Sequence, residues 1–244
     1  MSVWQAIGEI IGSYPARTGL AGSLASLLDP DNWLPGGRDA AFTLALVCLS
    51  AKMAVADGVV TASEVRAFGR TVEIPPGAED QVRRVFQLAQ EDVAGYDAYA
   101  RRIARFFADS PATLELVLDG LFHIASADGM IHEAEFDYLK SVSGIFGFDD
   151  KRFEQIASQH VVRGGGGDPY IVLGLDPSAP DSEIKRVWRR LVAENHPDRL
   201  TAKGVPDELI VLMSQKLAAI NHANDVIARA RGMRGPGARE TLAP

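Results

Sequence analysis

The sequence predicts an all-α protein built from two helical units joined by a glycine-rich hinge. Apolar residues recur at helical spacing along most of the chain, as at Val82, Val85, Phe86 and Ala89, and no convincing alternation of apolar and polar residues predicts a strand. One helical pattern also occurs twice in the first two thirds of the chain, and a run of four glycines follows at 164–167. A chain of 244 residues, 47% hydrophobic and 23% charged, has the length and composition of two globular domains.

The N-terminal segment, residues 1–35, is expected to contain a short helix. Trp4, Ile7 and Ile11 are spaced to form one apolar face, which we expect to pack on the rest of the protein. Binding of this helix to a membrane surface is the alternative, but its polar face lacks the basic residues that such helices usually carry. Because Glu9 interrupts the apolar stretch and no basic region precedes it, a signal peptide is not expected.

The most apolar stretch, residues 40–51, is predicted to form a buried helix. It is shorter than the roughly 20 residues that cross a bilayer, so no transmembrane segment is expected. Cys48 lies within it and is the only cysteine, so it cannot form an internal disulfide and is predicted to be a small buried apolar side chain. We therefore expect a cytoplasmic protein, with peripheral membrane association as the alternative.

An internal repeat follows, in which residues 51–68 align with residues 122–139. Each copy reads as a helix ending in Ala-Asp-Gly, a short turn and a second helix. Gly58 and Gly129 suit the left-handed residue that closes a helix. Two such hairpins, with the helices between them, predict a single all-α bundle.

The repeat also places carboxylates at matching positions. They are Asp57, Glu64, Asp128 and Glu135. If the two hairpins pack about a pseudo-twofold axis, these oxygens could converge on Ca²⁺ or Mg²⁺. The alternative is that they cap helices, because Thr61 to Glu64 has the form of a capping box and the spacing lacks the dense ligand series of an EF-hand loop.

The paired ADG(V/M)I…E hairpins resemble the TerB domain, an all-α module associated with tellurite resistance, over roughly residues 36–160. In that family, acidic residues near the hairpins are linked to metal binding. We expect that no cofactor is required, with a divalent cation in the TerB-like domain, Ca²⁺ or Mg²⁺, as the one candidate. His132 stands where the first copy has Thr61, so the second copy departs from the first.

The glycine run marks the clearest domain boundary, because four glycines would lose too much conformational entropy inside a packed element. The expected divisions are an N-terminal helical segment at 1–35, the TerB-like domain at 36–163, a hinge at 164–168, a helical hairpin at 169–234 and a disordered tail at 235–244.

Three helices are predicted after the hinge. Asp168 and Pro169 form a typical helix start, and the short helix that they open ends near Gly174. A second helix spans about 180–194 and a third about 207–230, with a loop, HPDRLTAKGVP, between them. Two antiparallel helices would hold that loop at one end of a small hairpin domain.

Charge is unevenly distributed between the two units. Residues 1–167 carry 14 basic and 22 acidic side chains, whereas residues 168–234 carry 10 basic and 9 acidic ones. With a net charge of −7, the chain lacks the basic footprint of a general nucleic-acid binder. The outer side of the second C-terminal helix nevertheless carries a basic stripe. It consists of Lys185, Arg186, Arg189 and Arg190.

His196 and Asp198 flank Pro197 and invite an enzymatic interpretation, which fails on three grounds. The segment has no Ser or Cys nucleophile beside them, the glycine-poor loop offers no oxyanion or phosphate cradle, and one His with one Asp is too small a ligand set for a metal. We therefore predict that the protein is not an enzyme and has no catalytic residues.

Four motifs in order, D-P-Y-x-V-L-G-L, E-I-K-R-V-W-R-R-L, H-P-D-R and A-x-I-N-x-A, resemble the J domain of Hsp40 (DnaJ-type) co-chaperones over about residues 169–232. The insertion LTAKGVPDELI and the TerB-like domain in front resemble the DjlA-type subgroup most closely. Glu194, Asn195 and Asn224 depart from the family pattern, the first standing where a basic residue is common and the other two where aromatic residues are usual. DjlA-type proteins carry an N-terminal membrane span, which is not expected here.

The resemblance implies a binding surface for a DnaK-type Hsp70. Its residues are His196, Pro197, Asp198, Arg199, Lys185, Arg186, Arg189 and Arg190. In the family, the basic helix meets an acidic face of Hsp70 and the His-Pro-Asp tripeptide contacts the junction of its nucleotide domain and interdomain linker, which accelerates ATP hydrolysis by Hsp70.

We therefore expect an Hsp70 co-chaperone whose TerB-like domain targets it or binds a client protein, with homodimerisation as a further expectation. The alternative is a TerB-type metal- or stress-response binding module whose J domain is vestigial.

Overall fold

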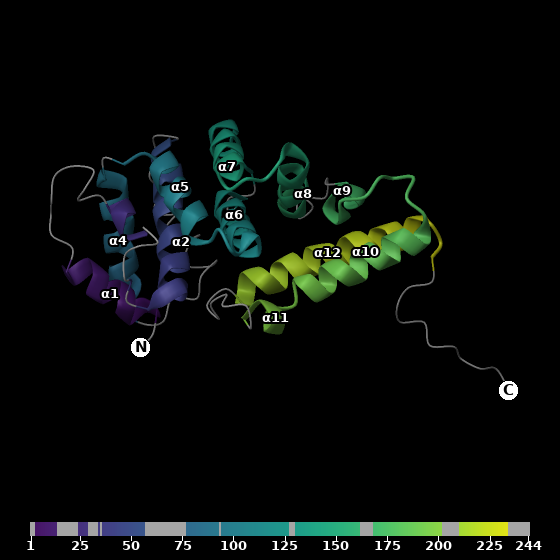
Figure 1. The fold of residues 1–244 in the computed structure, drawn as a ribbon. Coiled ribbons are helices and arrows are strands. Elements are labelled where there is room, and N and C mark those ends of the chain that lie inside the picture. The colour runs from purple at the N-terminus through teal and green to yellow at the C-terminus, as the bar shows by residue number, and fades with distance from the viewer. Residues whose placement is uncertain are drawn as a thin grey trace.

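The computed structural model describes residues 3–13, 24–28, 34, 36–56, 77–92, 94–126, 130–161, 168–201 and 210–233. Within these ranges every regular element is a helix (Figure 1), which confirms the all-α prediction. The elements are α1 (Val3–Ser13), the 3-10 helix η2 (Leu24–Leu28), α2 (Gly37–Ala56), α4 (Glu79–Glu91), α5 (Tyr96–Phe106), α6 (Pro111–Ala125), α7 (Glu133–Ile145), α8 (Asp150–Val161), α9 (Pro169–Leu173), α10 (Asp181–Glu194), α11 (Pro197–Thr201) and α12 (Ile210–Ala230).

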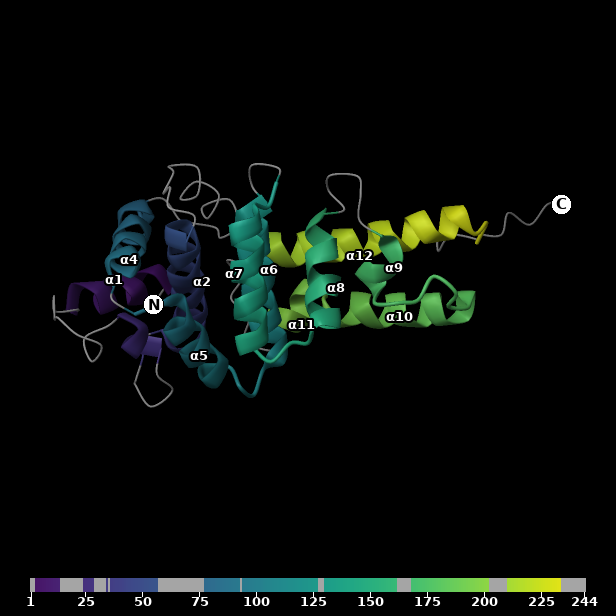
Figure 2. The same cartoon turned by 90° about the horizontal axis from the view of Figure 1, so that it is seen from above.

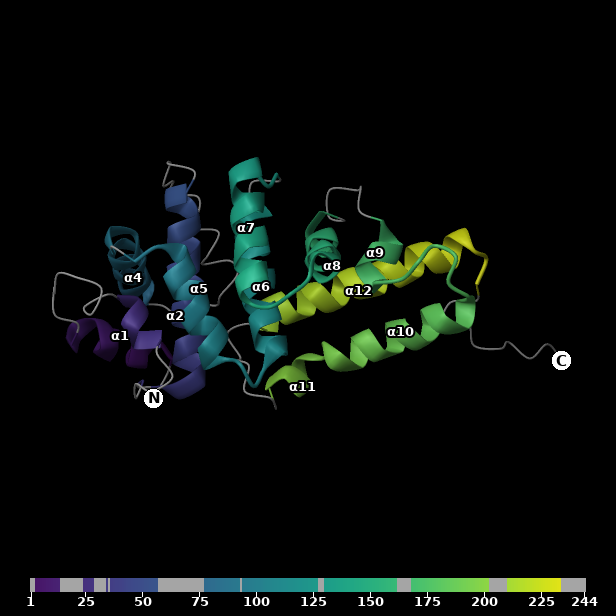
Figure 3. The ribbon, with the colours of Figure 1, turned by 45° about the horizontal axis from the view of Figure 1, so that its top comes forward.

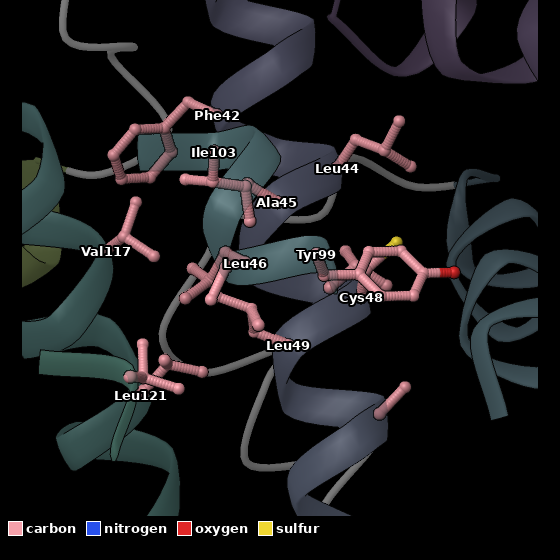
Figure 4. Close-up of a cluster of buried hydrophobic side chains, with 14 of the residues drawn as sticks. Phe42, Leu44, Ala45, Leu46, Cys48, Leu49, Tyr99, Ile103, Val117 and Leu121 are labelled. Carbon is pink, nitrogen blue, oxygen red and sulfur yellow. The ribbon is translucent and has the colours of Figure 1, made fainter. Parts of the chain in front are cut away.

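Helix α2 is the centre of the N-terminal bundle, as its apolar sequence predicts. Every residue from Ala40 to Ala54 is buried, and α1, α4, α5, α6 and α7 all pack against this helix. Figure 4 shows Phe42, Leu46 and Leu49 of α2 among side chains of α5 and α6. The hydroxyl of Ser50 donates to the carbonyl of Leu46 at 2.7 Å, so this buried polar group costs little.

The first helix packs on this bundle, as expected. Trp4 and Ile7 are almost completely buried in the same apolar core. Hydrogen bonds also join α2 to other parts of the bundle: the hydroxyl of Tyr138 donates to the carbonyl of Leu49 at 2.8 Å, and Lys52 of α2 donates to the carbonyl of Asp92 at 2.7 Å.

The internal repeat is partly within the described residues. In the second copy, α6 is followed by α7 across a gap at 127–129, which fits the predicted helix–turn–helix order. In the first copy, α2 ends at Ala56 and the expected second helix lies outside the described residues, as do Gly58 and Gly129.

The C-terminal unit is a helical hairpin in which α10 and α12 lie side by side and α9 packs against both (Figures 1 and 2). It has an apolar cluster of its own. That cluster contains Val172, Leu173, Ala179, Ile184, Val187, Leu191, Ile220, Ala223 and Ile227. The predicted cap is confirmed, since the carboxylate of Asp168 accepts a hydrogen bond from the backbone of Tyr170 at 2.8 Å.

The loop prediction for HPDRLTAKGVP is wrong at its start. Residues 197–201 form the short helix α11, which has a proline at its first position. Leu200 of this helix is 3% exposed and joins the core of the N-terminal bundle. The sequence did not predict this helix because its only buried side chain, among the described residues, is Leu200, and the apolar surroundings of Leu200 belong to the N-terminal bundle. Residues 202–209 lie outside the described residues.

The hairpin packs directly on the bundle. Helix α12 crosses α6 and α8 (Figure 3), α9 contacts α8, and Met213 of α12 is buried in the bundle core. Gln155 of α8 donates to the carbonyl of Val172 at 3.2 Å. Of the predicted hinge only Asp168 is described, and the predicted tail at 235–244 lies outside the described residues.

We expect Gly174→Ala to destabilise the protein. Gly174 closes α9 with φ +68°, and an added Cβ would lie 2.7 Å from the side-chain nitrogen of Gln155. The left-handed conformation alone costs a non-glycine residue about 1–2 kcal/mol, and Gln155 must also move from Val172. Urea unfolding measures the loss in free energy. The control is Gly144→Ala in α7, where nothing lies within 4 Å and we expect no loss. Equal effects of the two substitutions would contradict this account.

Candidate functional site

Helix α10 presents its basic residues to solvent. Lys185, Arg186, Arg189 and Arg190 are all exposed, while Ile184, Val187 and Leu191 are buried on the opposite side. Arg186 pairs with Glu183 at 3.1 Å. The principal packing partners of α10 are α9, α11 and α12, whereas α9 and α12 pack on the N-terminal bundle. The basic stripe predicted from the sequence is therefore an outward face of the hairpin.

The turn after α10 brings His196, Pro197 and Asp198 to the surface. The side chain of His196 is 51% exposed and that of Asp198 is 91% exposed. Nδ1 of His196 lies 3.7 Å from Oδ2 of Asp198, which is longer than a hydrogen bond. Because neither side chain is buried and the two are not hydrogen-bonded to each other, both remain accessible to a partner molecule.

The turn is held from both ends. Asn195 closes α10, because its backbone N–H and its side-chain amide both donate to the carbonyl of Leu191, at 3.0 and 2.8 Å. Arg199 donates to the carbonyl of Ala193 at 3.4 Å, and buried Leu200 anchors the other end. Asn195 departs from the aromatic residue usual in J domains, and here it acts as a helix cap.

The predicted metal-binding carboxylates are only partly described. Asp57, Glu64 and Asp128 lie outside the described residues. Glu135 is described and buried, and its Oε2 accepts a hydrogen bond from the backbone of His132 at 2.9 Å, which is the capping role considered as the alternative. In the described ranges no three His, Cys, Asp or Glu side chains are grouped to hold a metal ion. The convergence of the four carboxylates stays a prediction.

A buried ion cluster, which the sequence interpretation missed, joins the hairpin to the bundle. Lys216 of α12 contacts Oε1 of Glu115 at 2.5 Å and also donates to Asp119, both on α6. Arg152 of α8 donates to Glu115 through Nε at 3.2 Å, and Nε2 of His160, also on α8, lies 3.0 Å from Asp119.

The charges of this cluster stabilise one another despite their burial. Burial acts to lower the pKa of Lys216, but the carboxylates of Asp119 and Glu115 outweigh it and raise that pKa above its ordinary value. Burial likewise acts to raise the pKa of Asp119, but Lys216 and His160 hold it below its usual range. One sequence signal was available: Lys216 follows Met213 and precedes Ile220 at helical spacing, so it falls on the buried face of α12.

Comparison with known proteins gives three further findings. Residues 43–158 match the family of the tellurite resistance protein TerB. The co-chaperone protein DjlA of Coxiella burnetii is 32% identical over 200 residues, which cover 74% of each chain. DjlA of Photobacterium profundum is 28% identical over 225 residues, which cover 81% of this chain and 80% of the relative. DjlA of Shewanella oneidensis is 23% identical over 235 residues, which cover 91% of this chain and 88% of the relative. No solved structure matches.

The chain joins a TerB domain to a helical hairpin with an exposed His-Pro-Asp turn and a basic helix face, and the relatives that it matches over most of its length are named co-chaperones, so its class is that of the DnaJ-type co-chaperones. The chain belongs to the DjlA co-chaperone family. Among the helices that the structure describes, none is both long enough and apolar enough to cross a membrane.

We expect the ion cluster to make stability sensitive to acid. The folded-state pKa of Asp119 is below its unfolded value of about 3.9. Its contribution is therefore fully present above about pH 4 and is lost as the pH falls through the folded pKa. Asp119→Asn should cost about 3 kcal/mol at pH 6, as expected for a broken buried pair, and the difference in Tm from the wild type should shrink between pH 6 and pH 2.

Thermal melts followed by circular dichroism measure both effects. The control is Asp225→Asn, which changes an exposed carboxylate on α12 and should alter Tm little. A difference between wild type and Asp119→Asn that stays constant down to pH 2 would show that ionisation of Asp119 does not matter.

Proposed function

We propose that the protein docks on a DnaK-type Hsp70 through α10 and the His196–Asp198 turn and stimulates ATP hydrolysis by that partner. The observation that carries the proposal is the orientation of the hairpin. Its α9 and α12 pack on the bundle, whereas the basic face of α10 and the turn stay exposed. Membership in a family whose relatives are named co-chaperones supports the same function.

The basic face of α10 supplies the long-range part of docking. Four exposed cations within two turns of helix would attract an acidic surface and orient the encounter. Such interactions act mainly on the association rate and are screened over about 8 Å at physiological salt. This face therefore sets how often the two proteins meet correctly and how that frequency depends on salt.

The turn supplies the short-range part. Pro197 restricts the backbone and Leu200 is fixed in the core, so little conformational entropy is lost when the turn binds. The exposed carboxylate of Asp198 can accept a charge-assisted hydrogen bond from an arginine of the partner. In this proposal the chemistry takes place in Hsp70, and the turn changes the conformation of that enzyme.

The TerB domain has a different part in the proposal, namely to bind a client or to set the location where Hsp70 is recruited. Its helices α1, α4 and α5 are not among the principal packing partners of the hairpin, so their surfaces could be engaged while the turn binds Hsp70. General binding of unfolded clients is not included, because the chain has neither zinc-finger cysteines nor a Gly/Phe-rich region.

We expect the purified protein to raise the steady-state ATPase rate of its cognate DnaK-type Hsp70 and His196→Gln to return that rate to the basal value. The substitution removes the imidazole from an exposed turn, so the fold should be unchanged. His222→Gln, on the exposed side of α12, is the matched control and should stimulate like the wild type. Failure of the folded wild-type protein to stimulate would refute the proposal.

The double variant Arg189→Gln, Arg190→Gln should weaken docking without changing the maximal rate. Exposed charge pairs contribute up to about 1 kcal/mol each, so the half-saturating concentration should rise by at most about thirtyfold at low salt. The effect should fade as salt is raised. The rate as a function of protein concentration at two salt concentrations measures this, with Arg229→Gln on exposed α12 as control. A loss of maximal rate at unchanged half-saturation would assign these arginines another role.

A further inference from the structure

Several residues near the turn end of the hairpin attach it to the bundle. Leu200 of α11 and Met213 of α12 are buried in the bundle core, and Lys216 lies less than one helical turn beyond Met213. Helix α11, which carries Asp198, also contacts α10 and α12. The position of the exposed turn relative to α10 is therefore coupled to the way in which the hairpin sits on the bundle.

Lys216 supplies a charge that the bundle lacks at this place. Helix α6 carries two buried carboxylates, Glu115 and Asp119. Within the ion cluster, Arg152 of α8 pairs with Glu115 and not with Asp119. Without Lys216, Asp119 would keep His160 as its neighbour and would have no permanent cation among the residues that the structure describes. Removal of one partner from a buried ion cluster leaves an uncompensated charge, which is far more costly than loss of an exposed pair.

Other polar atoms of the same interface oppose docking. The side-chain oxygens of Gln159 on α8 and Gln215 on α12 are buried beside Lys216, and neither has a hydrogen-bond partner in the described part of the chain. Such groups lose hydration when the interface closes. The ion cluster therefore has to offset this cost for the hairpin to stay packed on the bundle.

We infer that Lys216 is a positioning residue for the proposed stimulation of Hsp70: it locks the hairpin on α6 and thereby holds the His196–Asp198 turn in its binding geometry. The inference depends on the proposed function. Lys216 does not touch the partner in this account, because its side chain is 4% exposed. It acts by pre-organisation: it keeps the turn in the geometry that stimulates ATP hydrolysis, whereas the basic face of α10 provides most of the attraction to the partner.

The test uses the full chain and Lys216→Met, which keeps an unbranched side chain only one heavy atom shorter and removes its charge. We expect amide exchange in residues 198–201 to become at least tenfold faster, because α11 loses its fixed position on the bundle. Maximal stimulation of Hsp70 should fall about tenfold, while the half-saturating concentration changes less than threefold, since the basic face of α10 is intact. Lys140→Met, at an exposed position of α7, is the control and should change neither quantity.

Two further variants separate positioning from a general loss of fold. Adding Asp119→Asn to Lys216→Met removes the unpaired carboxylate, so slow exchange and most of the stimulation should return. If Lys216→Met fails to fold, Leu200→Ala provides the test instead, because it loosens the same turn without changing a charge. This variant should then lower the maximal rate.

Faster exchange with unchanged maximal stimulation would overturn the positioning role, as would unchanged exchange in Lys216→Met. Lack of stimulation by the wild-type chain is a different result, because it would refute the proposed function itself.

Discussion

Helix α2 is apolar on every side, so it is stable only when other helices cover all of its faces. This constraint places α1, α4, α5, α6 and α7 around it. Helix α6 is then buried on two sides, toward α2 and toward the hairpin, and nearly every residue from Thr113 to Ala125 is buried. Its two carboxylates cannot reach water freely, so cations of α8 and α12 must neutralise them. The attachment of the hairpin follows from the way the bundle covers its central helix.

The arrangement separates two electrostatic tasks within one small domain. The cation on the inner side of the hairpin, Lys216, is dehydrated and serves attachment. The cations on its outer side, such as Arg189 and Arg190, are hydrated and available to a partner. A buried charge has one geometry and strong coupling, whereas exposed charges act at a distance and respond to salt. The near-zero net charge of residues 168–234 conceals this division between inside and outside.

Local signals in the sequence were sufficient for much of the fold and for the candidate site. The spacing of Ile184, Val187 and Leu191 set the buried side of α10, and with it the exposed side, while Asp168 and Gly174 set the ends of α9. Those features depend on neighbours within a few residues. The burial of Leu200 and the pairing of Lys216 with residues about 100 positions away depend on how two units meet, which no local pattern encodes. The glycine run suggested independent units, and it carries no information about the contacts that form between them.

One detail of the core has a practical consequence. Cys48 is fully buried at the centre of α2, and burial raises the pKa of its thiol far above the ordinary value, so little reactive thiolate forms at neutral pH. Because it is the only cysteine, the native chain is silent toward thiol-directed dyes and spin labels as long as it stays folded. A pair of cysteines introduced on the surface, one on the bundle and one on the hairpin, could carry probes without removal of a native residue. The buried thiol would in turn report unfolding by becoming reactive.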